Sequence, residues 1–263
     1  MAYETLTYEK RGRACWITLN RPDALNAISQ QVMDDLSAAL DAAEADEDVW
    51  AAVLTGAGRA FCAGADLKDV LGILTGDDAE AIRAFMNNAY RMFRRVAQFE
   101  KPLIAAVNGI AAAGGLELIL GCDLVIAAES AKIGDAHANY GLVPGGGSSI
   151  RLPRKIGQTR ARQLLYTGEF LPARTLMDWG LVNEVVPDGE LTNAVNAMLE
   201  KMLAKSPVVL RRMKRLVDDG LDAPLDPALR LEMMAWEAHS KSEDLKEGLN
   251  AFSEKRTPAY SGR

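Results

Sequence analysis

The chain has 263 residues, of which 49% are apolar, so it can bury the core of one large α/β domain and is far from a disordered composition. Its net charge is −6 and its basic residues are spread along the chain, which argues against the basic stripe of a nucleic-acid-binding protein. Three widely spaced cysteines, Cys15, Cys62 and Cys122, exclude a disulfide framework and are typical of free thiols in a reducing compartment.

Targeting and metal-binding signals are also missing from the sequence. No C-x-x-C pair is present, so a structural zinc site is not expected. The first residues are polar and include an acid, unlike a signal peptide, and no apolar run is long enough for a transmembrane helix. We therefore expect a cytoplasmic protein with no metal, no membrane partner and no nucleic-acid partner.

Predicted strands and helices alternate from the start of the chain. Residues 5–9 and 14–19 alternate apolar and polar side chains, which predicts two strands joined by a turn. Ser29 is expected to cap a helix that ends near residue 45, because apolar residues recur after it at helical spacing. Residues 49–55 are almost all apolar, as in a parallel strand that is covered on both faces.

The same alternation continues to about residue 133. The expected helices cover residues 66–74, 78–99 and 114–120, and the expected strands cover residues 101–107, 123–128 and 131–133. Asp77 or Asp78 would cap the second of these helices. Residues 56–65 form a glycine-containing loop, and Asn108 and Gly109 form a turn.

The last third of the chain is mostly helical. The glycines at residues 145–147 form a flexible loop before two helices, and residues 181–186 form a late strand. From residue 191 onward the pattern is helical, with breaks expected at Pro207, Pro224 and Pro227. Strands that alternate with helices, followed by a helical tail, predict an α/β core over residues 1–195 and a C-terminal helical region over residues 196–263.

Two glycine-rich segments follow buried strands: residues 61–68 (Phe-Cys-Ala-Gly-Ala-Asp-Leu-Lys) and residues 113–117 (Ala-Gly-Gly-Leu-Glu). Glycine lets a ligand approach the main chain closely, and the first N–H groups of a helix lack partners and carry partial positive charge. Two such N–H groups that converge from separate loops could hold a developing oxyanion. Tight packing between strand and helix would explain either segment alone, so both interpretations stand at this point.

Other glycine-dependent sites are not supported. Gly56 and Gly58 follow a strand, but Phe61 stands where the dinucleotide-binding motif G-x-G-x-x-G needs its third glycine. The chain contains no G-x-x-x-x-G-K-[ST] motif and no G-x-S-x-G motif, so neither a P-loop nor a serine-hydrolase elbow is expected.

Together with shorter motifs, these two segments resemble the enoyl-CoA hydratase/isomerase (crotonase) superfamily. The matching pieces occur in the family's order between residues 19 and 256, so the resemblance covers nearly the whole chain. Each piece alone is modest, whereas the ordered set is specific. The pieces are residues 19–27, 61–68, 104–117, 122–123, 141–144, 168, 173, 180–182 and 252–256.

The resemblance implies a repeated ββα spiral core with a C-terminal helical region, assembled as a homotrimer or as a dimer of trimers. It also implies that the substrate is an acyl-CoA thioester and that the N–H groups of Ala65 and Gly114 form an oxyanion hole. Coenzyme A would enter as part of that substrate, with no separate cofactor. Lys255 matches a lysine that reaches the CoA phosphates of a neighbouring subunit. The residues expected to contact the CoA thioester are Leu25, Ala27, Ala63, Ala65, Asp66, Leu67, Lys68, Gly114 and Lys255.

The family's hydratases use two glutamates, and this chain matches only one of them. Glu117 lies three residues after Gly114, as the first glutamate does in the family. The second is expected twenty residues later, where this chain has His137 in a segment that otherwise matches without a gap. Glu117 and His137 are therefore the expected catalytic pair, and the chain departs from the family's pattern at the second position.

Hydration of a 2-enoyl thioester needs one group that takes a proton from water and another that supplies a proton to the enolate. Glu117 could act as the base, and His137 could supply the proton as imidazolium or orient the water as neutral imidazole. Asp135 could stand in as the acid or orient His137, and Tyr140 is a further candidate. Structural interpretations stay open, namely a helix-start acid for Glu117 and a hydrogen-bonded core histidine for His137.

The leading expectation is an enoyl-CoA hydratase-like lyase. Because the second glutamate is replaced, other reactions of the superfamily stay open, among them hydrolysis, decarboxylation, dehalogenation and isomerisation of a CoA thioester. Isomerases of the family rely mainly on the missing glutamate, whereas hydrolysis or decarboxylation fits a Glu/His site better. A catalytically idle CoA-binding protein is the remaining alternative, and the retained Glu117 argues against it. Residues 70–93 either line an acyl tunnel or pack as helical core.

Overall fold

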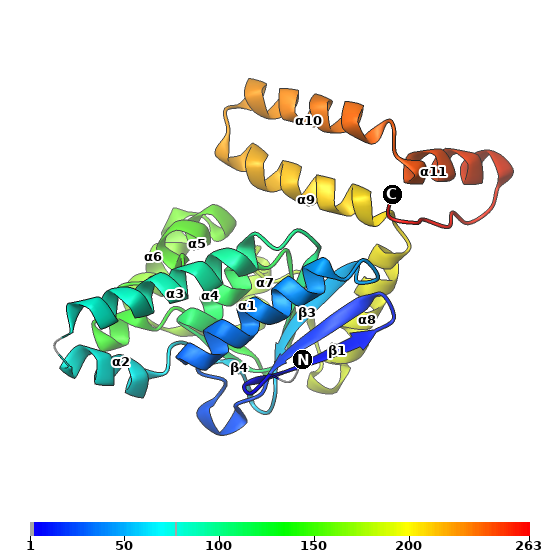
Figure 1. Ribbon diagram of the computed structural model, residues 1–263. Helices are drawn as coiled ribbons and strands as arrows, with labels where there is room; N and C mark the ends of the chain where they lie inside the picture. The colour runs from blue at the N-terminus through cyan, green and yellow to red at the C-terminus, as the bar shows by residue number, and fades with distance from the viewer. Residues whose placement is uncertain (1–2, 77) are drawn as a thin grey trace. The chain divides into compact units, whose positions relative to one another are not determined.

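The computed structural model describes residues 3–76 and 78–263, and the chain divides into two compact units (Figure 1). The first comprises Met1–Phe99 and Leu103–Ala197, and the second comprises Glu100–Pro102 and Met198–Arg263. The domain boundary expected between residues 195 and 196 stays a prediction, because compactness does not test which segment folds alone. No helix within the described ranges combines the length and the hydropathy that a membrane span requires.

The first unit contains a six-stranded and a four-stranded sheet, and both are mixed. The larger has the order β1-β2-β3-β5-β7-β10, and only β1 and β2 pair antiparallel within it. Its strands are β1 (Leu6–Arg11), β2 (Ala14–Leu19), β3 (Ala51–Gly56), β5 (Leu103–Val107), β7 (Leu124–Ala128) and β10 (Glu184–Val186). The smaller has the order β4-β6-β8-β9, and its last pair is antiparallel. Its strands are β4 (Ala60–Cys62), β6 (Ile110–Ala112), β8 (Lys132–Gly134) and β9 (Phe170–Pro172).

A unit of two strands followed by a helix recurs along the chain. In the pairs β3–β4, β5–β6 and β7–β8, the first strand joins the six-stranded sheet and the second joins the four-stranded sheet. Helices follow each pair: α2 (Leu67–Thr75) and α3 (Ala79–Ala97), then α4 (Gly114–Gly121), then α5 (Ser148–Ile156). The predicted α/β core with its ββα repeat is therefore present. Because β4, β6 and β8 are parallel neighbours in the four-stranded sheet, the loops that leave these strands lie next to one another.

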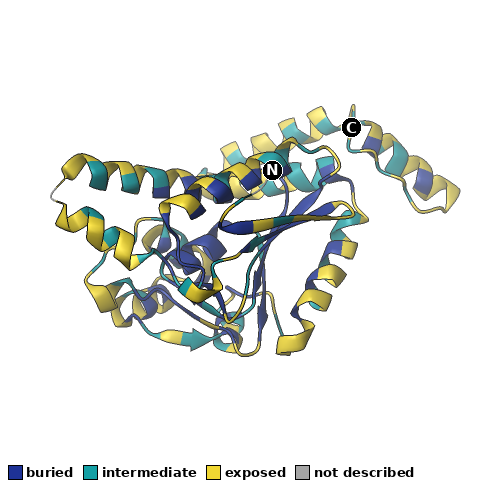
Figure 2. Ribbon diagram, turned by 60° about the horizontal axis from the view of Figure 1, so that its bottom comes forward, coloured by how far each residue is buried: buried dark blue, intermediate teal, exposed yellow. Residues whose placement is uncertain are grey.

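One face of the six-stranded sheet carries the hydrophobic core. Alternate residues of β2, such as Cys15 and Ile17, pack with α1 (Gln30–Ala45), α3 and α4, whose inner faces include Leu36, Val96 and Leu116. Each fully buried aliphatic side chain of this kind stabilises the fold by about 1.5–3 kcal/mol. Figure 2 shows the central strands of the larger sheet buried and the outer faces of the helices exposed, and α1 and α3 follow this amphipathic pattern.

Side-chain caps fix where three of these helices begin. The hydroxyl of Ser29 accepts a hydrogen bond from the N–H of Val32 at 3.3 Å, which confirms the predicted start of α1. Asp66 caps α2, and Asp78 caps α3 by accepting from two N–H groups of its first turn. The alternative cap for α3, Asp77, lies outside the described residues.

The remaining elements of the first part of the chain are η1 (Pro22–Ala24), η2 (His137–Tyr140), α6 (Gln158–Thr167), α7 (Ala173–Asp178), η3 (Asp188–Glu190) and α8 (Leu191–Leu203). The second unit is built from α9 (Pro207–Asp222), α10 (Leu225–His239) and α11 (Glu243–Glu254), with α9 and α10 side by side (Figure 1). Pro207 and Pro224 mark helix starts as predicted, but the break predicted at Pro227 is wrong. Pro227 lies in the first turn of α10, where its missing N–H costs nothing because first-turn N–H groups have no helical partner.

Candidate active site

In the loop after β4, the N–H of Ala65 has no hydrogen-bond partner among the described residues. Ala65 forms an isolated parallel bridge with Ile28, in which Gly64 O accepts from Ile28 N at 2.7 Å and Asp66 N donates to Ile28 O at 2.9 Å. A parallel bridge uses the groups that flank its central residue, so the N–H of Ala65 points away from Ile28. Within residues 3–76 and 78–263 no acceptor bonds this N–H.

The N–H of Gly114 is available for a different reason. Gly114 is the first residue of α4, and the first N–H groups of a helix have no partner inside it. The preceding residue, Ala113, has φ +48° and ψ −111°, a conformation that costs an L-residue about 1–3 kcal/mol. Its N–H donates to Gly134 O at 3.1 Å and its carbonyl accepts from Glu117 N at 3.0 Å, so both sides of the strained residue are held.

The two glycine-rich segments meet backbone to backbone. A Cβ atom built on Gly64, whose φ is +93°, would lie only 3.2 Å from Gly114 N, and one on Gly114 would lie 3.4 Å from Gly64 Cα. A Cβ on Gly115 would lie 2.1 Å from Cys62 O, so the start of α4 can approach β4 only because this residue is glycine. The structure thus brings the two segments together, as a shared oxyanion site requires.

Glu117 is buried in the first turn of α4, with 4% of its surface exposed. Its Oε1 accepts hydrogen bonds from the N–H of Gly146 at 2.7 Å and of Ser148 at 3.1 Å, so the loop before α5 holds one carboxylate oxygen in place. The other oxygen, Oε2, is the candidate proton acceptor. Burial raises the pKa of Glu117, and the hydrogen bond from Ser148 and the charge of His137 oppose this rise only in part.

His137 connects Glu117 to a second buried carboxylate. Its Nε2 lies 4.0 Å from Glu117 Oε2, and its Nδ1 lies 3.1 Å from Oδ1 of Asp135, which is 1% exposed. Because a carboxylate only accepts, Nδ1 is the donor in that bond. Burial lowers the pKa of His137, but the hydrogen bond and charge of Asp135 and the charge of Glu117 outweigh it and raise the pKa above its ordinary value.

The bond between Asp135 and His137 depends on the residue between them. Ala136 has φ +56°, a left-handed conformation that turns the chain so that both neighbouring side chains face the same way. His137 N also donates to Asp135 O at 2.8 Å. Tyr140, the other candidate in this segment, is 66% exposed and makes no contact of this kind among the residues described.

Four of the residues predicted to contact CoA are joined by hydrogen bonds, two of them through one arginine. Leu25 O accepts from Ala63 N at 3.0 Å, which joins the loop before α1 to the loop after β4. The guanidinium of Arg21 donates to Ala27 O at 2.6 Å and to Oδ2 of Asp66 at 3.0 Å. Arg21 lies in a matching sequence motif, but the motif does not predict that its side chain joins Ala27 to Asp66.

The other predicted CoA contacts are less constrained. Leu67 and Lys68 open α2 and are exposed, as contacts to a bound ligand require. Lys255 belongs to the second unit, where it ends α11 in a left-handed conformation and is exposed. Its role at the CoA phosphates stays a prediction.

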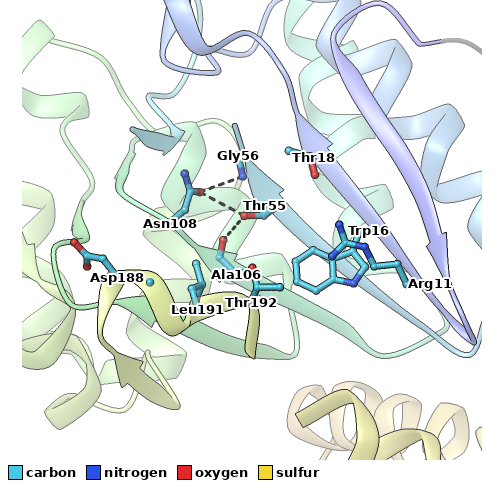
Figure 3. A pocket seen from close by; sticks show the side chains of 11 residues that line it. Arg11, Trp16, Thr18, Thr55, Gly56, Ala106, Asn108, Asp188, Leu191 and Thr192 are labelled. Carbon is cyan, nitrogen blue, oxygen red and sulfur yellow. Dashed lines mark hydrogen bonds between the residues drawn. The ribbon is translucent and has the colours of Figure 1, made fainter. Parts of the chain in front are cut away.

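A separate cavity of about 330 Å³ lies on the face of the six-stranded sheet that points away from the hydrophobic core (Figure 3). Trp16 and Thr55 line it, whereas Cys15 and Leu54 on the same strands face the core. Asn108 closes one side and accepts from Gly56 N at 3.1 Å (Figure 3). None of the predicted site residues lines this cavity, so it is distinct from the candidate active site.

Comparisons with known proteins agree over the full length of the chain. The profile of the family described as Enoyl-CoA hydratase/isomerase matches residues 9–263. A probable enoyl-CoA hydratase of Rhizobium meliloti is 40% identical and matches 100% of each chain. A short-chain-enoyl-CoA hydratase of Clostridium acetobutylicum is 35% identical, and the match covers 97% of each chain. The crystal structure of an enoyl-CoA hydratase from Bacillus anthracis matches with a TM-score of 0.94 at 37% identity and covers 99% of this chain and 100% of that one.

Proposed function

The chain belongs to the enoyl-CoA hydratase/isomerase family, and from that premise we propose that it adds water across the 2,3 double bond of an enoyl-CoA thioester. The observation that carries the proposal is the approach of His137 Nε2 to within 4.0 Å of Glu117 Oε2, in the segment that follows the two joined glycine loops. A proton acceptor and a proton donor stand together there, which hydration needs.

In the proposed mechanism the thioester oxygen accepts hydrogen bonds from the N–H groups of Ala65 and Gly114. These donors stabilise the negative charge that moves onto the oxygen when water attacks C3. Glu117 Oε2 takes a proton from the attacking water, and the imidazolium of His137 gives a proton to C2. The proton that Glu117 took from water then passes to His137. This transfer restores both groups, so that the net reaction is the addition of one water.

The exchange of a glutamate for His137 changes the charge balance of the site. Two neighbouring carboxylates repel each other and share a proton, whereas a carboxylate beside an imidazolium favours both charged forms. Asp135 adds a further negative charge at Nδ1 and holds the ring so that Nε2 faces Glu117. The site can therefore hold an ionised base and a protonated acid at the same time.

Thioester hydrolysis is the second candidate, and the bond between Asp135 and His137 favours it. A carboxylate that orients a histidine beside an oxyanion hole is the arrangement that activates a nucleophile in acyl transfer. In that reaction neutral His137 would take the proton from a water that attacks the thioester carbon, and the CoA thiolate would leave.

Incubation with crotonyl-CoA separates these reactions. We expect the ultraviolet absorbance of the enone to disappear and mass spectrometry to show one added water with CoA still attached. A thiol reagent serves as the control, since hydrolysis alone releases free CoA. Release of thiol without a hydrated product would contradict hydration, and tight binding without any reaction would identify an idle CoA-binding protein.

We also propose a homotrimer or a dimer of trimers. Within the second unit, large apolar side chains of α9 and α10 are exposed, and apolar patches of this kind are typical of protein interfaces. They include Val217, Leu221, Leu225, Met233 and Trp236. Light scattering after size-exclusion chromatography should give three or six times the mass of one chain, and Leu221→Asp should lower it. A stable single chain would contradict the proposal.

A further inference from the structure

The inner face of α3 lies directly against the candidate active site. A Cβ atom built on Gly146 would lie 2.4 Å from Cδ2 of Phe93 and 2.7 Å from Oε2 of Glu117. A Cβ on Gly114 would lie 3.4 Å from Cζ of the same phenylalanine. The ring of Phe93 therefore stands between the residue that donates to the thioester oxygen and the loop that holds Glu117.

The ring of Phe93 is packed in the core. Phe93 is 8% exposed and belongs to the hydrophobic core, and Ile28, which is 2% exposed, closes the site near Gly114. Seven residues earlier on the same face of α3, Met86 reaches Gly145 with its terminal methyl group and is 44% exposed. Two side chains of α3 thus border the loop that holds Glu117: the buried ring of Phe93 and, farther along the helix, the exposed and flexible Met86.

This arrangement limits how far an acyl chain can extend. With C2 and C3 held between Gly114 N and Glu117 Oε2, as the proposed mechanism requires, the ring of Phe93 is the large apolar side chain that lies beside both groups. We propose that Phe93 is a stop that restricts the enzyme to short acyl chains such as crotonyl, an inference that rests on the proposed function. Removal of the ring would open a path along α3 toward Met86.

The test compares enoyl-CoA thioesters with four, eight and twelve acyl carbons in the wild type, Phe93→Ala and Phe93→Leu. In the wild type kcat/KM should fall by about 100-fold or more from the shortest to the longest substrate, since an apolar pocket discriminates by about 10–200-fold per misfit group. Both variants should narrow that ratio by about 10-fold or more, and Phe93→Ala should do so most. Phe93→Leu keeps most of the apolar volume and guards against loss of folding in Phe93→Ala.

Phe99→Leu is the matched control, because Phe99 is a fully buried core phenylalanine that does not border the site glycines. It should leave the chain-length ratio unchanged. A wild type that hydrates all lengths equally, or a ratio unaltered in both folded Phe93 variants, would overturn the inference.

A binding measurement keeps the inference separate from the reaction. Calorimetry with saturated butyryl-CoA and dodecanoyl-CoA should show tighter binding of the shorter thioester by the wild type, and a reduced difference in Phe93→Leu. If no substrate is hydrated but this binding preference is found, the proposed reaction fails and the steric stop stands. If hydration is found without any length preference, the stop fails and the reaction stands.

Discussion

Glu117→Gln should lower kcat for crotonyl-CoA hydration by about 10²–10⁴-fold, the range that a positioned general base contributes. The glutamine oxygen can still accept from Gly146 N and Ser148 N, which hold Glu117 Oε1 at 2.7 and 3.1 Å. The variant therefore keeps the geometry of the loop before α5 and loses only the proton acceptor at Oε2. The Kd for the substrate should change little, because the two N–H donors of Ala65 and Gly114 remain.

The stability of the same variant gives an independent check. Since burial raises the pKa of Glu117, the ionised form costs folding free energy at every pH above that pKa, and the cost fades as the pH falls through it. A neutral glutamine removes the cost, so its thermal midpoint near pH 7 should equal or exceed that of the wild type. Glu80→Gln, at an exposed position in the first turn of α3, is the control for this stability measurement.

The kinetic measurement decides the role of Glu117. If Glu117→Gln keeps more than a tenth of the wild-type kcat, Glu117 is not the general base.

His137→Gln should lower kcat/KM by about 100-fold and abolish the loss of activity at high pH. In the wild type, kcat/KM should rise with pH as Glu117 loses its proton, at a pKa above its ordinary value. It should fall again as His137 loses its proton, also at a pKa above its ordinary value. The alkaline fall belongs to His137 alone and is absent without it.

Asp135→Asn tests whether the charge of Asp135 raises the pKa of His137. The amide oxygen of asparagine can still accept from Nδ1, so the ring keeps its orientation while the negative charge is lost. In this variant the effect of burial, which lowers the pKa of His137, outweighs the remaining charge of Glu117. The alkaline fall in kcat/KM should therefore occur at a lower pH than in the wild type. His239→Gln, which changes the other histidine in the second unit, should leave the profile unaltered. The same alkaline fall in His137→Gln and the wild type would exclude His137 as the acid.

The fold was predictable from the sequence where the signal is long or ordered. The Ser29 cap and the start of the helix at Gly114 were both recognisable because a polar cap or a glycine pair precedes an apolar helical pattern. The three-residue strands β4, β6 and β9 were missed, because three residues are too few to show alternation. β4 lies within residues 56–65, for which the sequence predicts a loop.

The sequence predicts which residues belong to the site better than it predicts the contacts between them. Motif order pointed to Glu117 and His137, but nothing in the sequence signals that Ala136 adopts a left-handed conformation, which is unusual for a residue with a Cβ. The glycines at residues 145–147 predict a flexible loop. In the structure that loop holds a carboxylate from a helix some thirty residues earlier in the chain, a long-range contact that no local pattern encodes.

The contact between the two glycine loops bears on how such a site can change over generations. The proposed donors to the thioester oxygen are main-chain N–H groups, which every amino acid except proline supplies, so most substitutions at Ala65 leave the donor in place. In the proposed mechanism Glu117 and His137 act through side-chain atoms, which a single substitution removes. Selection can therefore replace the groups that decide the fate of an enolate without dismantling the part that forms it. His137 is the position at which this chain departs from the pair of glutamates that the resemblance implies.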